Sequence, residues 1–210
     1  MSLTCTCPVG AAIPDLTIST CPVDLGQIQK VVFQRRYSTG TTLNEFTIAS
    51  ANPNLLASWT AVTSASDGTK AVVSPYISNP TVEEGAKREF GGGNATVGGI
   101  PINLGRESTT FTSELLRVSH VMVKELKGYE CEDLGVYLIG EDGKITGLAD
   151  DNSSATQFRP IPVTGFFVSD RRIGGYENPD VNVMSWSFLP NWSDELYTVT
   201  PSDFNALTQL

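Results

Sequence analysis

The fold class of this chain follows from one stretch of its sequence, Val136-Tyr137-Leu138-Ile139-Gly140-Glu141-Asp142-Gly143-Lys144-Ile145-Thr146-Gly147-Leu148. Two runs of β-branched, aromatic and aliphatic residues flank a short segment rich in glycine and acidic residues. Such a pattern is typical of two antiparallel strands joined by a tight turn. The stretch therefore predicts a β-hairpin.

Further runs of the same type lie on both sides of this hairpin. Residues 28–34, 69–74, 161–168, 181–188 and 196–199 are each rich in β-branched or aromatic residues. The first run is closed by Arg35-Arg36 and the second by Pro75, and loops rich in Asp, Gly, Asn and Pro separate the last three. Residues 43–49 alternate polar and apolar side chains, and with a turn at 37–42 they predict a hairpin with the first strand. We therefore expect an α+β, mainly β protein that forms an antiparallel β-sandwich or open barrel.

Two segments have helical patterns. The clearer helix is predicted over about 112–127, with Thr112 as N-cap, an apolar stripe along one side, and Gly128 just beyond its end. Such a stripe suits a helix that flanks one face of a sheet. A short helix is predicted over about 53–65, because Asn52-Pro53 resembles an N-cap followed by proline at the first helical position.

Two other segments read as extended arms attached to a single β-rich domain at 25–210. Residues 1–24 are interrupted by prolines, and residues 75–112 form a Gly/Pro-rich stretch that predicts a long loop or a hairpin arm. The glycines of this stretch do not match a phosphate-binding motif. The candidate inter-subunit arm residues are Cys7, Pro8, Cys21, Pro22, Glu83, Glu84, Phe90, Gly92 and Asn94.

Composition narrows the class of protein. The 210 residues are 40% hydrophobic and 18% charged, which is a globular composition, and they can build one generous domain. Fourteen basic residues against 23 acidic ones give a net charge of -9, which disfavours tight binding to nucleic acid. The chain shows neither a signal-peptide pattern nor a long apolar run, so we expect no secretion signal and no membrane span.

The four cysteines leave one question open. Cys5, Cys7, Cys21 and Cys131 are expected to be free thiols in a reducing cytosol. A zinc site could recruit all four, but Cys-x-Cys is not the usual spacing of zinc ligands. We expect no cofactor.

The sequence offers little for catalysis. The only histidine, His120, falls in the middle of the predicted helix, where a structural role at the edge of helix and sheet is expected. Adjacent carboxylates such as Glu132-Asp133 and Asp150-Asp151 are expected to be solvated loop charges, although carboxylate pairs can hydrolyse glycosides when they face each other across a cleft. The chain is therefore predicted not to be an enzyme.

Aromatic residues near the C-terminal end keep a carbohydrate-binding module open as an alternative. Tyr176, Trp186, Trp192 and Tyr197 could form a platform on which sugars stack. For Trp186 the core is favoured instead, because strand alternation points Met184, Trp186 and Phe188 to one side.

Three stretches carry a resemblance to a known group of proteins. Cys21-Pro22-Val23-Asp24-Leu25-Gly26-Gln27-Ile28, Cys131-Glu132-Asp133-Leu134-Gly135-Val136-Tyr137 and Phe188-Leu189-Pro190-Asn191-Trp192-Ser193 resemble stretches in virion structural proteins of Bacteroidetes phages. The order of predicted elements is also similar to that of phage tail tube proteins.

This resemblance implies a structural protein of the virion, assembled in the host cytoplasm. Its copies would form stacked hexameric rings, joined by the arms and by paired sheet edges, with other virion proteins as further partners. Genomic DNA would pass through an acidic lumen without specific binding. A capsid decoration protein or a head-tail connector remains an alternative that would share the arms but assemble with a different symmetry.

Overall fold

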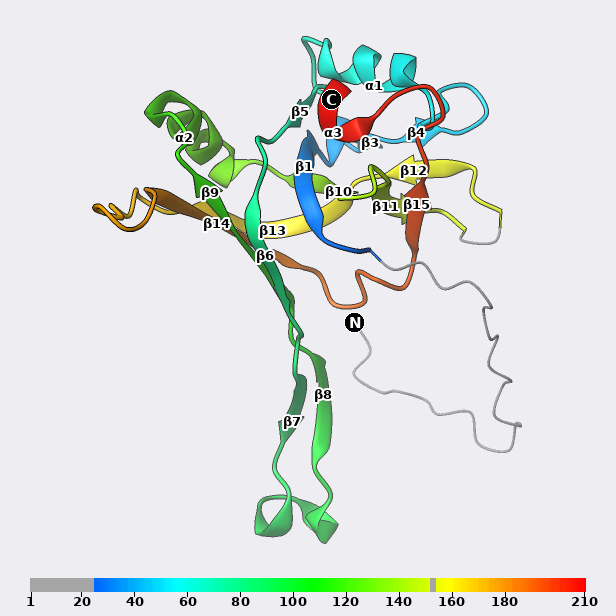
Figure 1. The fold of residues 1–210 in the computed structure, drawn as a ribbon. Helices are drawn as coiled ribbons and strands as arrows, with labels where there is room; N and C mark the ends of the chain where they lie inside the picture. The colour runs from blue at the N-terminus through cyan, green and yellow to red at the C-terminus, as the bar shows by residue number, and fades with distance from the viewer. Residues whose placement is uncertain (1–24, 152–153) are drawn as a thin grey trace.

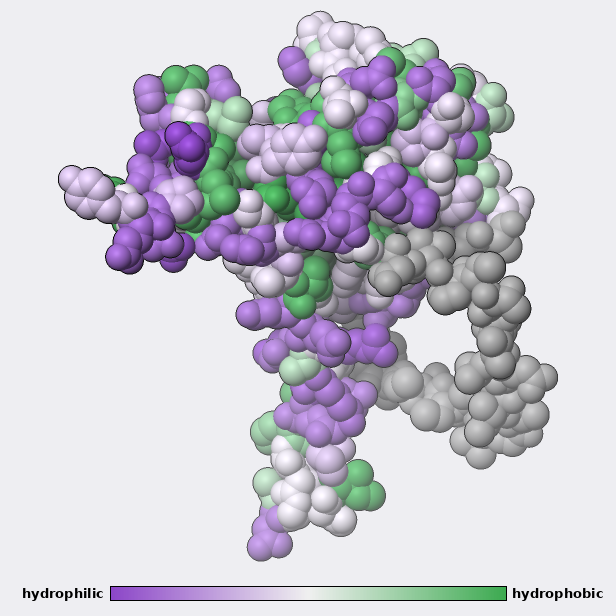
Figure 2. Space-filling model, in the orientation of Figure 1, coloured by the Kyte–Doolittle hydropathy of each residue, from purple (hydrophilic) through white to green (hydrophobic). Residues whose placement is uncertain are grey.

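The computed structural model describes residues 25–151 and 154–210, and antiparallel strands dominate it, accompanied by a few short helices (Figure 1). This confirms the expected α+β, mainly β class. A slender hairpin projects from the body, as the space-filling view also shows (Figure 2). The strands are β1 (Ile28–Arg35), β2 (Tyr37–Thr39), β3 (Thr42–Leu43), β4 (Phe46–Thr47), β5 (Ala71–Val73), β6 (Ser78–Glu83), β7 (Lys87–Phe90), β8 (Ile102–Arg106), β9 (Thr109–Leu116), β10 (Leu134–Gly140), β11 (Ile145–Ala149), β12 (Gln157–Arg159), β13 (Ile161–Val168), β14 (Val181–Phe188) and β15 (Leu196–Val199). The helices are α1 (Leu56–Thr63), α2 (His120–Lys127) and α3 (Ala206–Gln209), with short 3-10 turns η1 (Gly93–Ala95), η2 (Val97–Gly99) and η3 (Gly128–Cys131).

The main sheet curls into a barrel. β1 pairs with β10, and the order then runs through β13, β14 and β9 to β6. The chain closes this ring itself, because β5 pairs with β1 and runs on into β6. Between the two strands, the amide of Ser74 donates to the carbonyl of Val31 (2.8 Å) and the amide of Ile77 donates to that of Gln29 (2.9 Å). Residues 71–83 thus belong to the barrel wall.

A second part of the sheet branches from β10. One edge of β10 pairs with β13 near Val136 and with β11 near Leu138, while its other edge pairs with β1. β11 then pairs with β12 and β15, and β12 pairs with β4. Every residue of β10 is buried, because the strand has apolar contacts on both faces. The predicted hairpin of residues 136–148 is confirmed by the pairing of β10 with β11.

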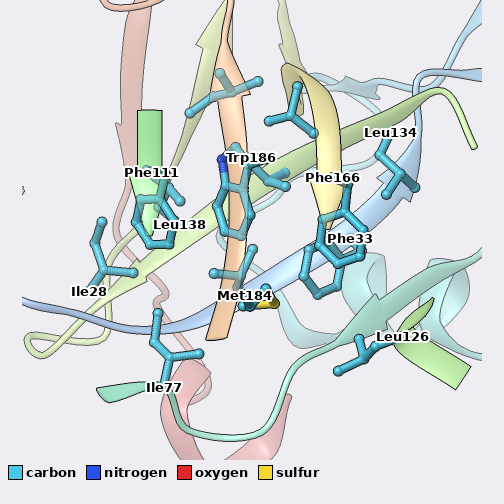
Figure 3. Packing of buried hydrophobic residues seen from close by; sticks show 14 of the residues in the cluster. Ile28, Phe33, Ile77, Phe111, Leu126, Leu134, Leu138, Phe166, Met184 and Trp186 are labelled. Carbon is cyan, nitrogen blue, oxygen red and sulfur yellow. The ribbon is translucent and has the colours of Figure 1, made fainter. Parts of the chain in front are cut away.

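The first hydrophobic cluster fills the barrel (Figure 3). Phe33 packs edge-on against Phe166, with ring centroids 5.3 Å apart, and Phe111 stacks on Trp186 at 4.1 Å. Met184, Trp186 and Phe188 are all buried, as strand alternation predicted. Burial of each large apolar side chain contributes roughly 1.5–3 kcal/mol, so these inward-facing residues stabilise the barrel.

The second cluster lies on the opposite face of β1 and β10. Trp59 of α1 is fully buried there, its ring centroid lies 4.7 Å from that of Phe46, and its indole N–H donates to the carbonyl of Pro53 (2.8 Å). Tyr137 and Ile139 of β10 face this cluster, whereas their neighbours in β10 face the barrel. None of the helices within residues 25–151 and 154–210 is long and apolar enough to cross a membrane.

The helix predicted over 112–127 is wrong in its first half. Residues 109–116 form β9, which pairs with β14 along its whole length, and α2 begins only at His120 with Ser119 as its N-cap. Leu115 belongs to the apolar stripe of the predicted helix, but it also fits the alternating burial of β9, which lies between β14 and β6. Pairing on both edges of β9 outweighs local helix propensity here.

The first part of the chain also departs from expectation in detail. The short helix predicted over 53–65 exists as α1, but it begins at Leu56, and Asn52 forms a turn before it by accepting the amide of Asn54 (2.9 Å). The hairpin predicted between residues 28–34 and 43–49 is wrong. β1 pairs instead with β10 and β5, and Phe46 pairs with β12.

Candidate assembly interface

The projecting hairpin begins where β6 and β9 leave the barrel. Gly85 lies against the opposite strand at this junction, since a Cβ added to it would stand 2.1 Å from the carbonyl oxygen of Glu107. The amide of Glu107 donates to the carbonyl of Ala86 (2.8 Å), which joins the barrel strands to the ribbon formed by β7 and β8. We call residues 84–108 the arm (Figure 1).

The part of the arm nearest the body, residues 84–89 and 103–108, carries the charged side chains of the arm, and we call it the stem. Lys87 pairs across the ribbon with Arg106, and Lys87 also forms an ion pair with Glu89. The guanidinium of Arg88 lies 3.8 Å from the carboxylate of Glu107. Both pairs are largely exposed, and such surface ion pairs contribute only about 0–1 kcal/mol. The stem is therefore held mainly by its backbone ladder.

The outer part of the arm, residues 90–102, carries no charged side chain, and we call it the tip. Residues 103–105 are also uncharged, but they lie across the ribbon from Arg88 and Glu89. Its apolar side chains point into solvent: Phe90 is 58% exposed, Val97 103% and Ile100 72%. Figure 2 shows hydrophilic residues over the stem and mostly white to green residues toward the tip. Phe90 and Ile102 are directly paired across the ribbon, which places two apolar residues side by side.

Hydrogen bonds at Thr96 fix the shape of the tip. Its hydroxyl accepts the amide of Gly92 (3.0 Å) and donates to the carbonyl of Ile100 (2.8 Å). Gly92 has a φ of 106°, a conformation that side chains with a Cβ rarely adopt. The tip is therefore a defined turn that presents apolar side chains, although those side chains bury little surface within their own chain.

Such an arm is suited to bind another protein surface. Exposed apolar groups in a contiguous patch mark interaction sites in soluble proteins, and a projecting ribbon has two strand edges that can pair with further strands. Near the base of the arm, Arg106 donates a hydrogen bond to the side-chain oxygen of Asn191 in the body (3.2 Å).

The structure places five of the candidate arm residues on this hairpin or at its base. Glu83 ends β6, Glu84 follows it, Phe90 ends β7, and Gly92 and Asn94 lie in the turn of the tip. All are exposed except the half-buried Gly92. The other candidates, Cys7, Pro8, Cys21 and Pro22, lie outside the described residues.

Sequence reasoning missed four exposed apolar side chains of the arm, three in the tip and Leu104 nearer the body. Val97, Ile100, Ile102 and Leu104 are each more than half exposed, yet they were not among the candidates. One signal could have found them. Residues 90–105 form a charge-free run that is rich in glycine and lies between charged segments, whereas the longer charge-free run of 46–66 contains no glycine.

The candidate catalytic residues belong to three different parts of the chain: His120 starts α2, Glu132 follows η3 and Asp150 follows β11. His120 is exposed at the first position of α2, so the expected place in the middle of a helix at the sheet edge is wrong. The bidentate pair with Arg35 lowers the pKa of Glu132, and hydrogen bonds from Thr156 and Gln157 lower the pKa of Asp150 well below its ordinary value. These carboxylates are held as anions rather than as proton donors. The prediction that the chain is not an enzyme stays a prediction.

The aromatic residues of the carbohydrate alternative do not share a surface. Trp186 is buried, which confirms its predicted place in the core, and Trp192 is half-buried and stacked on Phe188 at 4.3 Å. Tyr197 packs against the second cluster, whereas Tyr176 is fully exposed in the loop between β13 and β14.

Of the four cysteines, Cys131 lies within the described residues. Cys131 is an exposed free thiol at the end of η3. Within residues 25–151 and 154–210, no three His, Cys, Asp or Glu side chains are grouped so as to hold a metal ion. Cys5, Cys7 and Cys21 lie outside those ranges.

Comparison with known proteins gives a distant likeness. No family model matches the chain, and no curated protein matches it. Among solved structures, it is similar to a chain described as "Tail of empty GTA particle computed with helical refinement, C6 symmetry", where GTA stands for gene transfer agent. The match covers 60% of this chain and 82% of that chain, with 10% sequence identity and a TM-score of 0.31.

Proposed function

We propose that this chain is a self-assembling structural subunit of a phage-like tail, and that its arm joins neighbouring copies. The observation that carries the proposal is the charge-free, apolar tip of residues 90–102, held away from the body on a charged stem. A lone protein gains nothing from exposing these side chains to water. Burial of these side chains against a neighbouring copy would stabilise the contact by about 25 cal/mol for each Å² of apolar surface covered.

The tip alone cannot hold an assembly together. Specific interfaces bury about 1,600 Å² in total, which is more than one hairpin turn can supply. Strand edges offer the remaining contacts. Within the described parts of the chain, β15 pairs only with β11, so its outer edge can accept a strand from a neighbour.

In its specific form, the proposal is a tail tube subunit that forms stacked hexameric rings. The resemblance to tail tube proteins supplies the ring and its six-fold order, and the barrel with a flanking helix and a long arm suits that role. The net charge of -9 fits a lumen through which DNA passes without binding, because few phosphate contacts would release counterions.

The alternatives have less support. A capsid decoration protein or a connector would use the same arm in an assembly of different symmetry, which particle imaging distinguishes. A carbohydrate-binding module would need an exposed aromatic row, and only Tyr176 of the four candidate aromatics is fully exposed.

Electron microscopy of the purified full-length chain tests the proposal. The expected result is rings or tubes that form above a threshold protein concentration. A monodisperse monomer at every concentration, measured by light scattering, would contradict it.

A matched variant tests the part played by the arm. Lys87 and Arg106 are paired across the ribbon, so residues 88–105 can be replaced by Asn-Gly, which closes a two-residue hairpin turn between them. The body should unfold at an unchanged temperature, while assembly is lost. Retained assembly would exclude the arm as a joining element.

A further inference from the structure

A cleft lies at the end of the barrel opposite the arm. At one end of β1, the carbonyl of Gln29 accepts a hydrogen bond from the amide of Ile77. Ile77 directly precedes β6, which leads into the arm. The opposite end of β1, at Gln34 and Arg35, borders a cleft of about 330 Å³ between the start of β5, η3 and the start of β10. The arm therefore points away from β5 and from the end of β1, which border the cleft of the same chain (Figure 1).

The floor of this cleft is apolar. Phe33 and Leu134 are buried beneath it, and Val72 and Tyr129 form its half-buried sides. The ring of Tyr129 lies 6.1 Å from that of Phe33, so the aromatic wall of the cleft is continuous with the barrel core. An apolar side chain placed here would extend that core.

The charged rim of the cleft is balanced. Arg35 donates to both carboxylate oxygens of Glu132, at 2.8 and 2.6 Å. Asp67 accepts the amide and the hydroxyl of Thr69, at 2.9 and 2.5 Å. Arg35 and Lys70 offset Asp67 and Glu132, so the lining has no net charge. A charged occupant would gain little from this rim and would lose its hydration.

We propose that the cleft receives the tip of the arm from a second copy of this chain. The tip carries no charge and presents apolar side chains on a narrow turn, which matches a neutral cleft with an apolar floor. The exposed Lys70 can donate to the peptide carbonyls of the Gly-rich turn. This inference rests on the proposed function and specifies where the arm binds.

The geometry gives the contact a head-to-tail form. Tip and cleft are different surfaces at opposite ends of one molecule, so each copy can donate its tip to one neighbour and receive the tip of another. Contacts of this kind produce closed rings or open stacks rather than isolated dimers.

Photo-crosslinking identifies the surface that the tip touches. p-Benzoylphenylalanine replaces Ile100, which is 72% exposed, and a control chain carries it at Val121, which is 51% exposed on α2. Chains grown on light and heavy nitrogen are mixed before assembly, so that mass spectrometry separates crosslinks between copies from those within one copy. The expected crosslinks from position 100 join the tip to residues 67–72 or 129–134 of another copy, and those from position 121 do not.

A second variant tests the same contact without a crosslinker. Val72→Glu introduces an unbalanced charge into the cleft, and Val121→Glu is its matched control on an exposed helix face. We expect Val72→Glu to raise the threshold concentration for assembly at least about tenfold, equal to a loss of about 1.4 kcal/mol. The control should assemble as the native chain does. Circular dichroism melts confirm that both variants stay folded.

The outcomes separate this inference from the proposed function. Assembly with crosslinks to the cleft, weakened by Val72→Glu, supports both. Assembly with crosslinks to another surface of a second copy, or an unaffected folded Val72→Glu variant, overturns the cleft as receptor and leaves the structural role intact. A chain that stays monomeric and crosslinks only within itself overturns both.

Discussion

Gly85 and Glu107 approach each other so closely that a methyl group on Gly85 would lie 2.1 Å from the carbonyl oxygen of Glu107. Cβ atoms in proteins essentially never come within 3.0 Å of such an atom, so the backbone would have to move. The contact lies where the barrel strands pass into the arm. Glycine at position 85 therefore allows the two strands to approach closely at the base of the arm.

Gly85→Ala should loosen the arm while the barrel stays folded. We expect faster hydrogen exchange at the amides of residues 86–107 and weaker assembly, because the bond from the amide of Glu107 to Ala86 is displaced. Gly128→Ala is the control, since Gly128 has a φ of -62° and open space around it. Unchanged exchange across the arm would mean that the strands adjust without losing their pairing.

Phe111→Ala should destabilise the barrel severely. The Phe111 ring is fully buried and stacks on Trp186 at 4.1 Å, and loss of a buried aromatic ring costs about 3–5 kcal/mol. Urea unfolding measures the change. Tyr176→Ala removes a fully exposed ring and should stay within about 0.5 kcal/mol of the native value. Equal effects of the two variants would contradict the assigned core.

Tyr137→Phe should test a buried hydrogen bond without making a cavity. The Tyr137 hydroxyl donates to the side-chain oxygen of Gln34 (3.3 Å), whose amide nitrogen donates to the carbonyl of Thr69 (2.6 Å). Burial raises the pKa of Tyr137 well above its ordinary value, so the hydroxyl keeps its proton. Its removal leaves a buried acceptor without this donor and should cost about 1–3 kcal/mol in thermal unfolding. No loss would show that the Gln34 oxygen finds another donor.

Asp150→Asn should change how stability depends on pH. The Asp150 carboxylate accepts the hydroxyl of Thr156 and the amides of Gln157 and Thr156, the amides both at 2.9 Å, and these hydrogen bonds lower its pKa far below the ordinary value. The folded state therefore takes up this proton at a lower pH than the unfolded state does. The ionised carboxylate thus stabilises the fold above about pH 4, and this contribution is lost as the pH falls further. The melting temperatures of the native chain and the variant should differ at neutral pH and converge in acid. A constant difference would exclude ionisation as the cause.

Local patterns predicted most of the strands and failed where a segment fits two structures. The runs at 161–168 and 181–188 became β13 and β14, because alternation and turn residues agree there. Residues 109–116 satisfy both a helical stripe and a strand between two partners. Their state is decided by β6 and β14, which are distant in sequence, so no local window contains the answer.

The candidate interface was predictable only in part, for the same reason. Glycines and prolines marked residues 75–112 as unusual, and the charge-free run of 90–105 could have located the tip. The cleft could not have been found, because Phe33, Val72 and Tyr129 come together only through the pairing of β1 with β5 and β10.

The exposed stem also makes the free subunit vulnerable. Lys87, Arg88 and Arg106 are trypsin sites on a two-stranded ribbon that makes few contacts with the body. A protease should therefore cut unassembled chains at the stem and spare those whose arms are covered by a neighbour. Limited digestion would then count the free arms in a sample, and removal of the arm would stop a subunit from joining without unfolding it.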